Sequence, residues 1–191
     1  MKTRSAKKDL ILQEAAKLFR EKGFGGTSMR DLAEKVGIEA ASMYNHIRSK
    51  DEILEEICFG AGRKYDEQLS EIERQDINYP RKLELMIAFH VQMIIEDGAA
   101  VSVLNNDWKF LSAEKMTEFK TMRNAYEKHF AALLKQGMEQ GFFKPMNVSI
   151  ALFTILSALR WVELWYKPGR NVSKEDLAKD ISALLMNGIK A

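Results

Sequence analysis

The sequence of 191 residues contains one cysteine and three prolines, and no run in it alternates polar and apolar residues as a strand would. With Cys58 alone, an internal disulfide and a zinc site built from several cysteines are both excluded, and a reducing compartment is indicated. The basic N-terminus precedes no uninterrupted apolar stretch, so we expect no secretory signal and a cytoplasmic protein. Hydrophobic residues at 46% and charged residues at 29% are typical of a folded chain.

Apolar residues recur at helical spacing along most of the chain, which predicts an all-α protein of about nine helices. Glycines, prolines and capping residues divide the pattern. We expect Thr27 to cap the second helix and Asn187-Gly188 to stop the last one. The Ser49-Lys-Asp-Glu52 capping box opens the fourth helix. Apart from this fourth helix, the expected helices cover residues 3–22, 28–36, 38–46, 79–96, 100–108, 113–139, 147–166 and 173–186.

The net charge of +2 is unevenly distributed. Residues 1–50 carry 11 Lys and Arg against six Asp and Glu, a net charge of +5, whereas residues 51–191 carry 18 against 21, a net charge of −3. A basic segment joined to a mildly acidic body suggests a polyanionic partner at one end. A solvated basic face without a partner explains the same numbers equally well.

Two short helices, 28–36 and 38–46, have the size and spacing of a helix-turn-helix, in which the second helix enters the DNA major groove. Ala33 is small where the two helices would cross, and Gly37 can adopt a positive φ at the turn. An ordinary αα-hairpin satisfies much of the same pattern, so the helices alone leave both interpretations open.

Specific residues of this region add a further signal. They are Phe19-x-x-x-Gly23, Thr27-Ser28-x-Arg30-Asp31-Leu32-Ala33, Gly37-Ile38 and Ser42-Met43-Tyr44-Asn45-His46-Ile47-x-x-Lys50-Asp51-Glu52-x-Leu54. Without a gap in the spacing, they resemble the N-terminal DNA-binding signature of TetR-type transcriptional regulators. Ile47 departs from the aromatic residue usual there, and both residue types fill an apolar pocket. The resemblance implies a three-helix DNA-binding domain over residues 1–50 and a larger helical ligand-binding and dimerisation domain over residues 51–191.

The resemblance also implies which residues contact double-stranded operator DNA. Thr27, Tyr44, His46 and Lys50 are expected at phosphates, which set the register of the complex. Bases would be read by Arg30 and by exposed side chains of the third helix. For Tyr44, a core aromatic is the alternative. The expected DNA-binding set is Thr27, Ser28, Arg30, Ala40, Ser42, Met43, Tyr44, Asn45, His46 and Lys50.

The stretch 148–166 is apolar on nearly all sides and long enough to raise a transmembrane alternative. Five polar residues oppose a lipid environment, among them Arg160 and Glu163, so we expect no membrane and a helix that is buried or in a subunit interface. TetR-type regulators are homodimers that pair their last two helices. The resemblance therefore implies an interface formed by Ile150, Phe153, Thr154, Ser157 and Trp161.

Aromatic and methionine side chains of the C-terminal part are expected to enclose a small hydrophobic effector, although most such side chains fill a core. The stretches Arg160 to Gly169 and Val172 to Leu177 are similar to the ending of TetR-type regulators of fatty-acid and aromatic-acid degradation, which commonly release DNA on binding an acyl-CoA. Smaller hydrophobic drugs or metabolites are rival ligands. The expected lining set is Phe89, His90, Met93, Trp108, Phe110, Met122, Arg123, Tyr126, Arg160, Trp161 and Trp165.

The sequence thus predicts a ligand-responsive DNA-binding repressor, not an enzyme. It shows no recognisable nucleophile–base pair, metal cluster or phosphate loop, and it implies no cofactor. His90 and His129 lack a cysteine nearby and a second ligand at helical spacing, which argues against a metal site. The alternatives are a helical acyl-binding or small enzyme module without DNA binding, and a helical scaffold protein.

Overall fold

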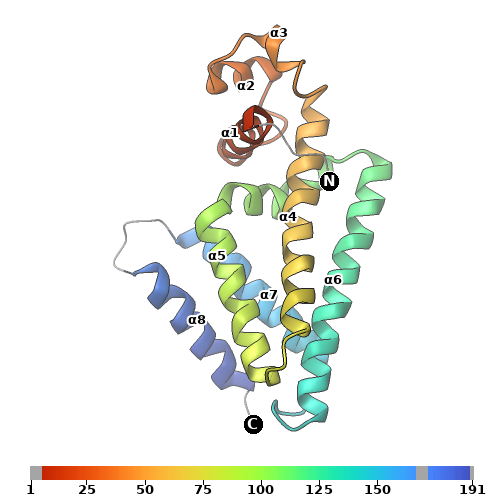
Figure 1. Cartoon of the computed structure of the whole chain (residues 1–191), viewed down its shortest axis with the longest axis vertical. Coiled ribbons are helices and arrows are strands. Elements are labelled where there is room, and N and C mark those ends of the chain that lie inside the picture. The colour runs from red at the N-terminus through yellow and green to blue at the C-terminus, as the bar shows by residue number, and fades with distance from the viewer. Residues whose placement is uncertain (1–5, 167–171, 190–191) are drawn as a thin grey trace. The chain divides into compact units, whose positions relative to one another are not determined.

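The structure is a computed structural model that describes residues 6–166 and 172–189. Over these residues the chain forms helices and no strand, which confirms the all-α prediction (Figure 1). Eight α-helices and one short 3-10 helix are close to the expected nine. In chain order they are α1 (Ala6–Lys22), α2 (Met29–Val36), α3 (Ala40–Met43), α4 (Lys50–Glu73), α5 (Tyr79–Asn106), η1 (Trp108–Phe110), α6 (Ala113–Glu139), α7 (Val148–Trp165) and α8 (Lys174–Ile189).

Local capping signals place several helix starts where the sequence predicted them. The Ser49 hydroxyl accepts a hydrogen bond from the Glu52 N–H at 3.1 Å, and the Glu52 carboxylate accepts one from the Arg48 N–H at 2.7 Å. The Asn147 side chain accepts bonds from the N–H groups of Ser149 and Ile150 at 3.0 and 3.2 Å. These bonds satisfy N–H groups that have no partner inside the helix.

The predicted bounds of two helices, the third and the last, are wrong, whereas the predicted break after residue 96 is confirmed. The third helix spans only Ala40–Met43, because the chain continues in turns up to His46. The two helices expected at 79–96 and 100–108 are confirmed as the two parts of α5, which a kink separates at Asp97, whose backbone is non-helical at φ −136° and ψ 35°. The last helix does not stop at Asn187-Gly188 but runs to Ile189, whose carbonyl accepts the Lys144 N–H at 2.8 Å.

The described residues form two compact units. The first unit contains the chain up to Arg63 together with Ala99–Thr121, and the second contains Lys64–Gly98 and the chain from Met122 onward. In the first unit, α1, α2, α3 and the start of α4 pack around fully buried side chains that include Phe19, Leu32, Met43, Ile47 and Leu54. The three helices α1, α2 and α3 thus pack against the start of α4, and this packing positions α2 and α3.

The second unit packs the remaining parts of α4, α5 and α6 with α7 and α8 around Leu69, Leu83, Phe130 and Phe143. Figure 1 shows α7 and α8 running in opposite directions along this unit. Residues 167–171, which include Lys167, Pro168 and Gly169 of the predicted ending motif, lie outside the described residues.

Candidate functional site

The start of α2 is closed by a reciprocal pair of residues, Ser28 and Asp31. The Ser28 hydroxyl accepts a hydrogen bond from the Asp31 N–H at 3.1 Å, and the Asp31 carboxylate accepts bonds from the Ser28 N–H, at 2.8 Å, and from the Ser28 hydroxyl. The bonds from Ser28, and then the charge of Lys22, lower the pKa of Asp31. Such a capping box fixes the direction in which the helix leaves the loop.

The prediction that Thr27 caps α2 is therefore wrong by one position. A cap residue needs extended backbone, and Ser28 has it, at φ −104° and ψ 162°. Thr27 is buried, and its hydroxyl donates to the Gly23 carbonyl at 3.0 Å. Its side chain stabilises the loop of residues 23–28, here called the α1–α2 loop.

The turn between α2 and α3 has the geometry that the sequence predicted. Gly37 lies at φ 70° and ψ 40°, and the N–H of Ile38 donates to the Ala33 carbonyl at 3.0 Å. A side chain at Gly37 would strain this left-handed conformation. Ala33 is buried, as expected for a residue where two helices approach closely.

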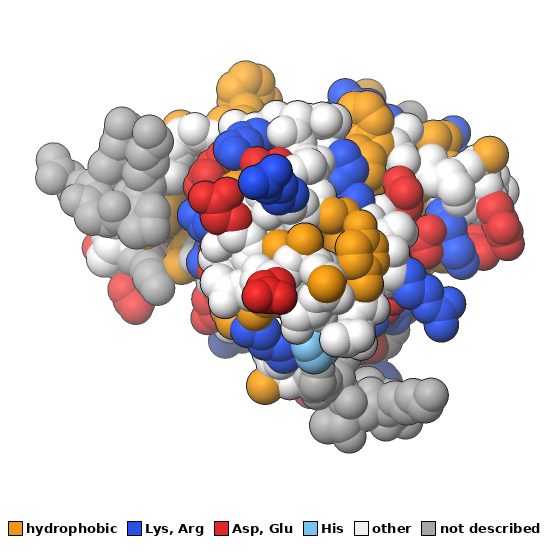
Figure 2. Space-filling model, turned by 90° about the horizontal axis from the view of Figure 1, so that it is seen from above, with side chains coloured by type: hydrophobic (Ala, Val, Ile, Leu, Met, Phe, Trp, Pro, Cys, Tyr) orange, Lys and Arg blue, Asp and Glu red, His pale blue; other side chains and the backbone are white. Residues whose placement is uncertain are grey.

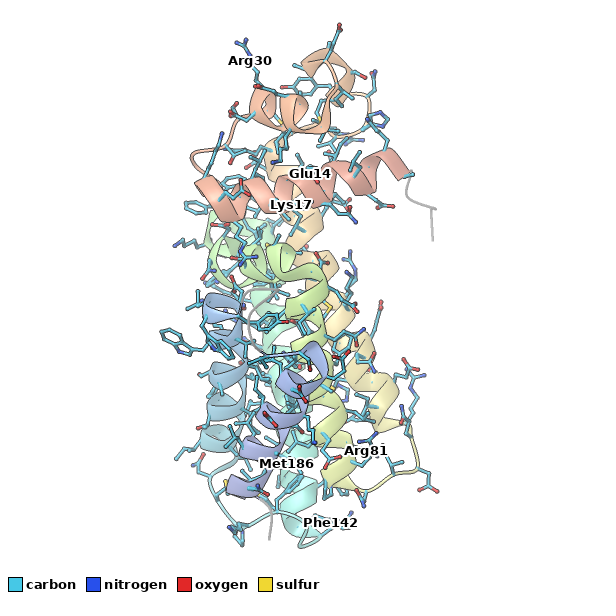
Figure 3. The ribbon with its side chains drawn as sticks, turned by 90° about the vertical axis from the view of Figure 1, so that its left-hand side faces the viewer. Glu14, Lys17, Arg30, Arg81, Phe142 and Met186 are labelled. Atoms are coloured by element: carbon cyan, nitrogen blue, oxygen red, sulfur yellow. The ribbon has the colours of Figure 1, made fainter. Side chains whose placement is uncertain are left out.

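Several predicted DNA-contacting residues are exposed next to this turn. Arg30, Ala40 and Asn45 are exposed, Ser42 and His46 are half-buried, and Tyr44 exposes 54% of its surface, which rules out the core alternative for Tyr44. In Figure 3 the Arg30 side chain points away from α2 into solvent. These side chains are therefore available to a large ligand.

Met43 lies among these exposed residues in the sequence but not in the structure. Its side chain is fully buried, as is that of Ile47. The prediction that Met43 reads bases is wrong, because Met43 is the residue that holds α3 on the core. The prediction that Ile47 fills an apolar pocket is confirmed.

The ammonium group of Lys50 is engaged within the first unit. It donates to the carbonyls of Phe24, at 2.8 Å, and Thr27, at 2.7 Å, and lies 4.3 Å from the centroid of the Phe24 ring. The lysine expected at a phosphate thus holds the α1–α2 loop against the start of α4.

Part of the predicted positive charge is neutralised inside the first unit. Lys8 pairs with Glu52 and Glu56. On α1, Lys17 pairs with Glu14, and Figure 3 labels both residues. Within residues 6–50, the exposed cations that join none of the described ion pairs are Arg20, Arg30, Lys35 and Arg48. Sequence reasoning missed Lys35 and Arg48, since a charge pattern does not show which cations are paired.

The surface that carries α2 and α3 is chemically mixed. In the view of Figure 2, Lys and Arg side chains lie among acidic ones around an apolar patch. Cations suit phosphates, and apolar and amide groups suit base edges. The surface of α2 and α3 therefore carries groups that suit the base edges in a DNA groove as well as groups that suit phosphates.

In the second unit, the predicted effector residues His90 and Tyr126 lie together in the interior. His90 Nε2 and the Tyr126 hydroxyl are 2.7 Å apart, and the ring of Tyr65 stacks on His90 at 4.5 Å. Burial lowers the pKa of His90 to about 4 and raises that of Tyr126. Phe89 and Phe130 contact the same group of rings. Sequence reasoning missed Tyr65 and Phe130, which come from α4 and the middle of α6.

The remaining predicted effector residues are not all brought to this cluster. Met93 is buried, while Met122 and Arg123 are half-buried in the second unit. Trp108 and Phe110 belong to the first unit, where Trp108 stacks on Phe119 at 6.0 Å and Phe110 stacks on Phe24 at 5.5 Å. On α7 the side chains of Arg160, Trp161 and Trp165 are exposed.

One face of α7 is apolar and exposed. Ile150 and Trp161 expose 66% and 63% of their surface, and Phe153 is exposed between them. Small polar residues, Ser149, Thr154 and Ser157, join Ile150 and Phe153 in lining a shallow groove of about 570 Å³. Together these residues include every member of the predicted dimer interface, and a second apolar surface would fit them.

By length and composition, α5 and α7 are apolar enough to cross a membrane, and half of the most apolar 18-residue stretch of α5 is buried inside the protein.

Cys58 is buried, and burial together with the charge of Asp107 raises the pKa of its thiol to about 12. A thiol with this pKa stays protonated at neutral pH and is a poor nucleophile. Within residues 6–166 and 172–189, no three His, Cys, Asp or Glu side chains gather as metal ligands would.

Two family models together match most of the chain. Residues 11–57 match the model of bacterial regulatory proteins of the tetR family, and residues 77–189 match the model of the tetracyclin repressor-like C-terminal domain. The HTH-type transcriptional repressor KstR2 of Rhodococcus jostii strain RHA1 is 28% identical over 189 residues, which cover 97% of this chain and 92% of that protein.

Solved structures share the fold. The ketosteroid transcriptional regulator KstR2 of Mycobacterium tuberculosis superposes with a TM-score of 0.91 at 24% identity, covering 100% of this chain and 97% of that one. AibR in complex with isovaleryl coenzyme A and operator DNA superposes with a TM-score of 0.83 at 22% identity, covering 94% and 98%.

Proposed function

The chain belongs to the tetR family of bacterial regulatory proteins, and from this premise we propose that it is a transcriptional repressor that a small hydrophobic effector releases from operator DNA. The observation that carries the proposal is the contrast within α3 and the turn after it. Met43 and Ile47 are buried, whereas Tyr44 and Asn45 between them are exposed. A short helix and turn that are anchored on one side and present polar groups on the other are suited to insertion into a major groove.

In this proposal, Tyr44, His46, Arg48 and Lys35 contact phosphates, and Arg30 and Asn45 read base edges. Phosphate contacts set affinity and register, and base contacts set specificity. An Arg in the major groove pairs best with guanine, through two hydrogen bonds. Ser28 contributes through the capping box, which orients α2 and hence Arg30.

An electrophoretic shift assay with DNA from upstream of the chain's own gene tests DNA binding. We expect binding to a specific duplex, which competitor DNA of random sequence removes only at large excess. A helical enzyme, an acyl-binding module or a scaffold protein predicts no shift. If no upstream duplex and no random duplex is bound at low salt, the proposal is wrong.

We further propose a homodimer that pairs α7 and α8 with their symmetry mates. The exposed apolar face of α7, with its small residues, supports this arrangement. A two-fold dimer places two copies of α3 about 34–36 Å apart, one turn of DNA, which matches a palindromic operator.

For the effector, an acyl-CoA is the candidate we favour. The sequence ending resembles acyl-CoA-responsive members, and AibR, which shares the fold, binds isovaleryl coenzyme A. The aromatic cluster around His90 offers apolar contacts to an acyl chain, and Arg123 and Arg160 offer cations to an anionic head group. A ketosteroid is the second compound to test, because the structural neighbour KstR2 is a ketosteroid regulator.

Titration of the protein with a panel of acyl-CoAs tests the effector. Trp108, Trp161 and Trp165 provide the fluorescence signal. A coupling of about 1–3 kcal/mol corresponds to a loss of operator affinity of roughly 5- to 150-fold, and operator DNA must weaken effector binding by the same factor. If acyl-CoAs change neither signal while a ketosteroid or another uncharged compound does, the acyl-CoA proposal is wrong.

We also propose that the protein acts without catalysis, metal or cofactor, and in the cytoplasm. The protonated thiol of Cys58 and the functions of the relatives support the first point. The division into a DNA-binding domain over residues 1–50 and an effector and dimerisation domain over residues 51–191 remains part of the proposal. Limited proteolysis with and without operator DNA would locate the boundary.

A further inference from the structure

An aromatic stack lies directly before α2, inside the first unit. The Phe24 ring, in the α1–α2 loop, stacks on Phe110 at 5.5 Å with 25° between the ring planes. The rings of Phe24 and of Phe19 in α1 meet edge to face, with their centroids 5.2 Å apart. Phe110 ends η1, in the connection between α5 and α6. Two segments 86 positions apart in the sequence are thus joined by one ring contact.

Lys50 holds the same loop from α4. Its ammonium lies 4.3 Å from the Phe24 centroid and donates to the carbonyls of Phe24 and Thr27. The Thr27 hydroxyl in turn donates to the Gly23 carbonyl. The loop is therefore held from α4 by polar contacts and from the α5–α6 connection by a ring, immediately before the Ser28 cap.

The two rings of the stack, Phe24 and Phe110, differ in how deeply they are buried. Phe24 is buried, whereas Phe110 exposes 46% of its surface. A half-exposed aromatic gains less from burial than a core residue does, so a small displacement of its backbone suffices to separate the rings. Phe110 is the contact in this arrangement that can change without unfolding the three-helix core.

We propose that Phe110 is a positioning residue for operator binding, which acts by holding Phe24 and thereby the start of α2 in place. Phe110 itself touches no DNA in this proposal. The α5 helix leads from Met93, through the non-helical residue Asp97, toward Phe110, so a change in α5 can reach the stack along the chain. The inference rests on the proposed function, since it assigns a role in DNA binding.

The full-length variant Phe110→Ala tests the proposal, with Phe142→Ala as the matched control. Phe142 lies in the α6–α7 connection, exposes 36% of its surface and contacts one ring, that of Tyr79, at 6.0 Å. Operator affinity is measured by fluorescence anisotropy, for the operator and for a random duplex. Hydrogen exchange of the DNA-free protein is measured over residues 24–31.

We expect Phe110→Ala to weaken operator binding by about fivefold or more, the lower end of typical coupling between sites, and to speed exchange over residues 24–31. Phe142→Ala should leave both unchanged. The variant Phe110→Leu keeps apolar bulk without the ring, and should fall between Phe110→Ala and the wild type. It replaces Phe110→Ala if circular dichroism shows that the alanine variant is unfolded.

The inference is overturned if a folded Phe110 variant binds operator as the wild type does, or if exchange over residues 24–31 is unchanged. A wild-type protein that binds no DNA overturns instead the proposed function. Equal weakening by Phe110→Ala and Phe142→Ala also contradicts the inference, because it indicates a general loss of stability.

Discussion

His90 Nε2 and the Tyr126 hydroxyl lie 2.7 Å apart, and both side chains are buried in the second unit. Burial lowers the pKa of His90 from 6.5 to about 4, so the imidazole is neutral in the folded protein at pH 7. A neutral imidazole can accept a hydrogen bond from the Tyr126 hydroxyl or donate one to it.

This pKa predicts how stability depends on pH. Between pH 6.5 and about 4, the unfolded chain binds a proton at His90 that the folded chain does not. The contribution of His90 to the free energy of unfolding is therefore fully present above pH 6.5 and is lost as the pH falls toward 4. Between pH 7 and 5 the free energy of unfolding falls by about 2 kcal/mol because of this group. Urea unfolding at both pH values measures the fall.

The variant His90→Gln keeps a hydrogen-bonding side chain but does not titrate. We expect its loss of stability between pH 7 and 5 to be smaller than that of the wild type by the same amount. If the wild type and His90→Gln lose equal stability, His90 is not the group responsible.

Two neighbouring residues of α3 and its turn should respond oppositely to substitution. Tyr44→Phe removes an exposed hydroxyl, so we expect unchanged stability and a loss of DNA affinity of about tenfold, equal for operator and random duplexes. Met43→Ala creates a cavity at a fully buried position, and should lower the free energy of unfolding by about 2–5 kcal/mol. Anisotropy titrations and urea unfolding separate the two effects, and a Tyr44→Phe variant with wild-type affinity would remove Tyr44 from the phosphate contacts.

Lys50→Met should destabilise the protein in the absence of DNA. The substitution removes the Lys50 donor from the Thr27 carbonyl, and it leaves the Phe24 carbonyl with only the longer bond from the Thr27 N–H, at 3.3 Å. A loss of about 2 kcal/mol corresponds to a fall in Tm of roughly 4–8 °C for a chain of this size. A residue that only contacts phosphate predicts no such fall, because removal of a cation from a basic surface does not destabilise the free protein.

The salt dependence of DNA binding by Lys50→Met then tests the phosphate contact predicted from the sequence. Loss of a direct phosphate contact lowers the slope of log affinity against log salt by about one. An unchanged slope together with a lower Tm assigns Lys50 to the α1–α2 loop alone.

The exposed face of α7 predicts the oligomeric state. Phe153→Glu and Trp161→Glu should yield a folded monomer in sedimentation, because both positions are exposed in the single chain and a buried, unpaired charge is costly only in the dimer. Phe142→Glu, at another exposed aromatic, should remain dimeric. A dimer that survives both α7 substitutions places the interface elsewhere.

The sequence alone determined the features that depend on neighbouring residues. The bounds of α6, at Ala113–Glu139, agree with the prediction because Gly141, at φ 76°, ends the helical stretch locally. The turn at Gly37 and the caps at Ser49 and Asn147 are equally local, since each depends on backbone groups within a few positions.

Tertiary structure decided what depends on partners far apart in the chain. The last helix passes Gly188 because Ile189 is buried and its carbonyl pairs with Lys144, so packing outweighs the local stop signal. Met43 is buried and Tyr44 exposed although both belong to one motif, because the core selects which face of a short helix it covers. The contact of Lys50 with the loop at Phe24 joins residues 26 positions apart, and no periodicity in the sequence encodes a contact at that distance.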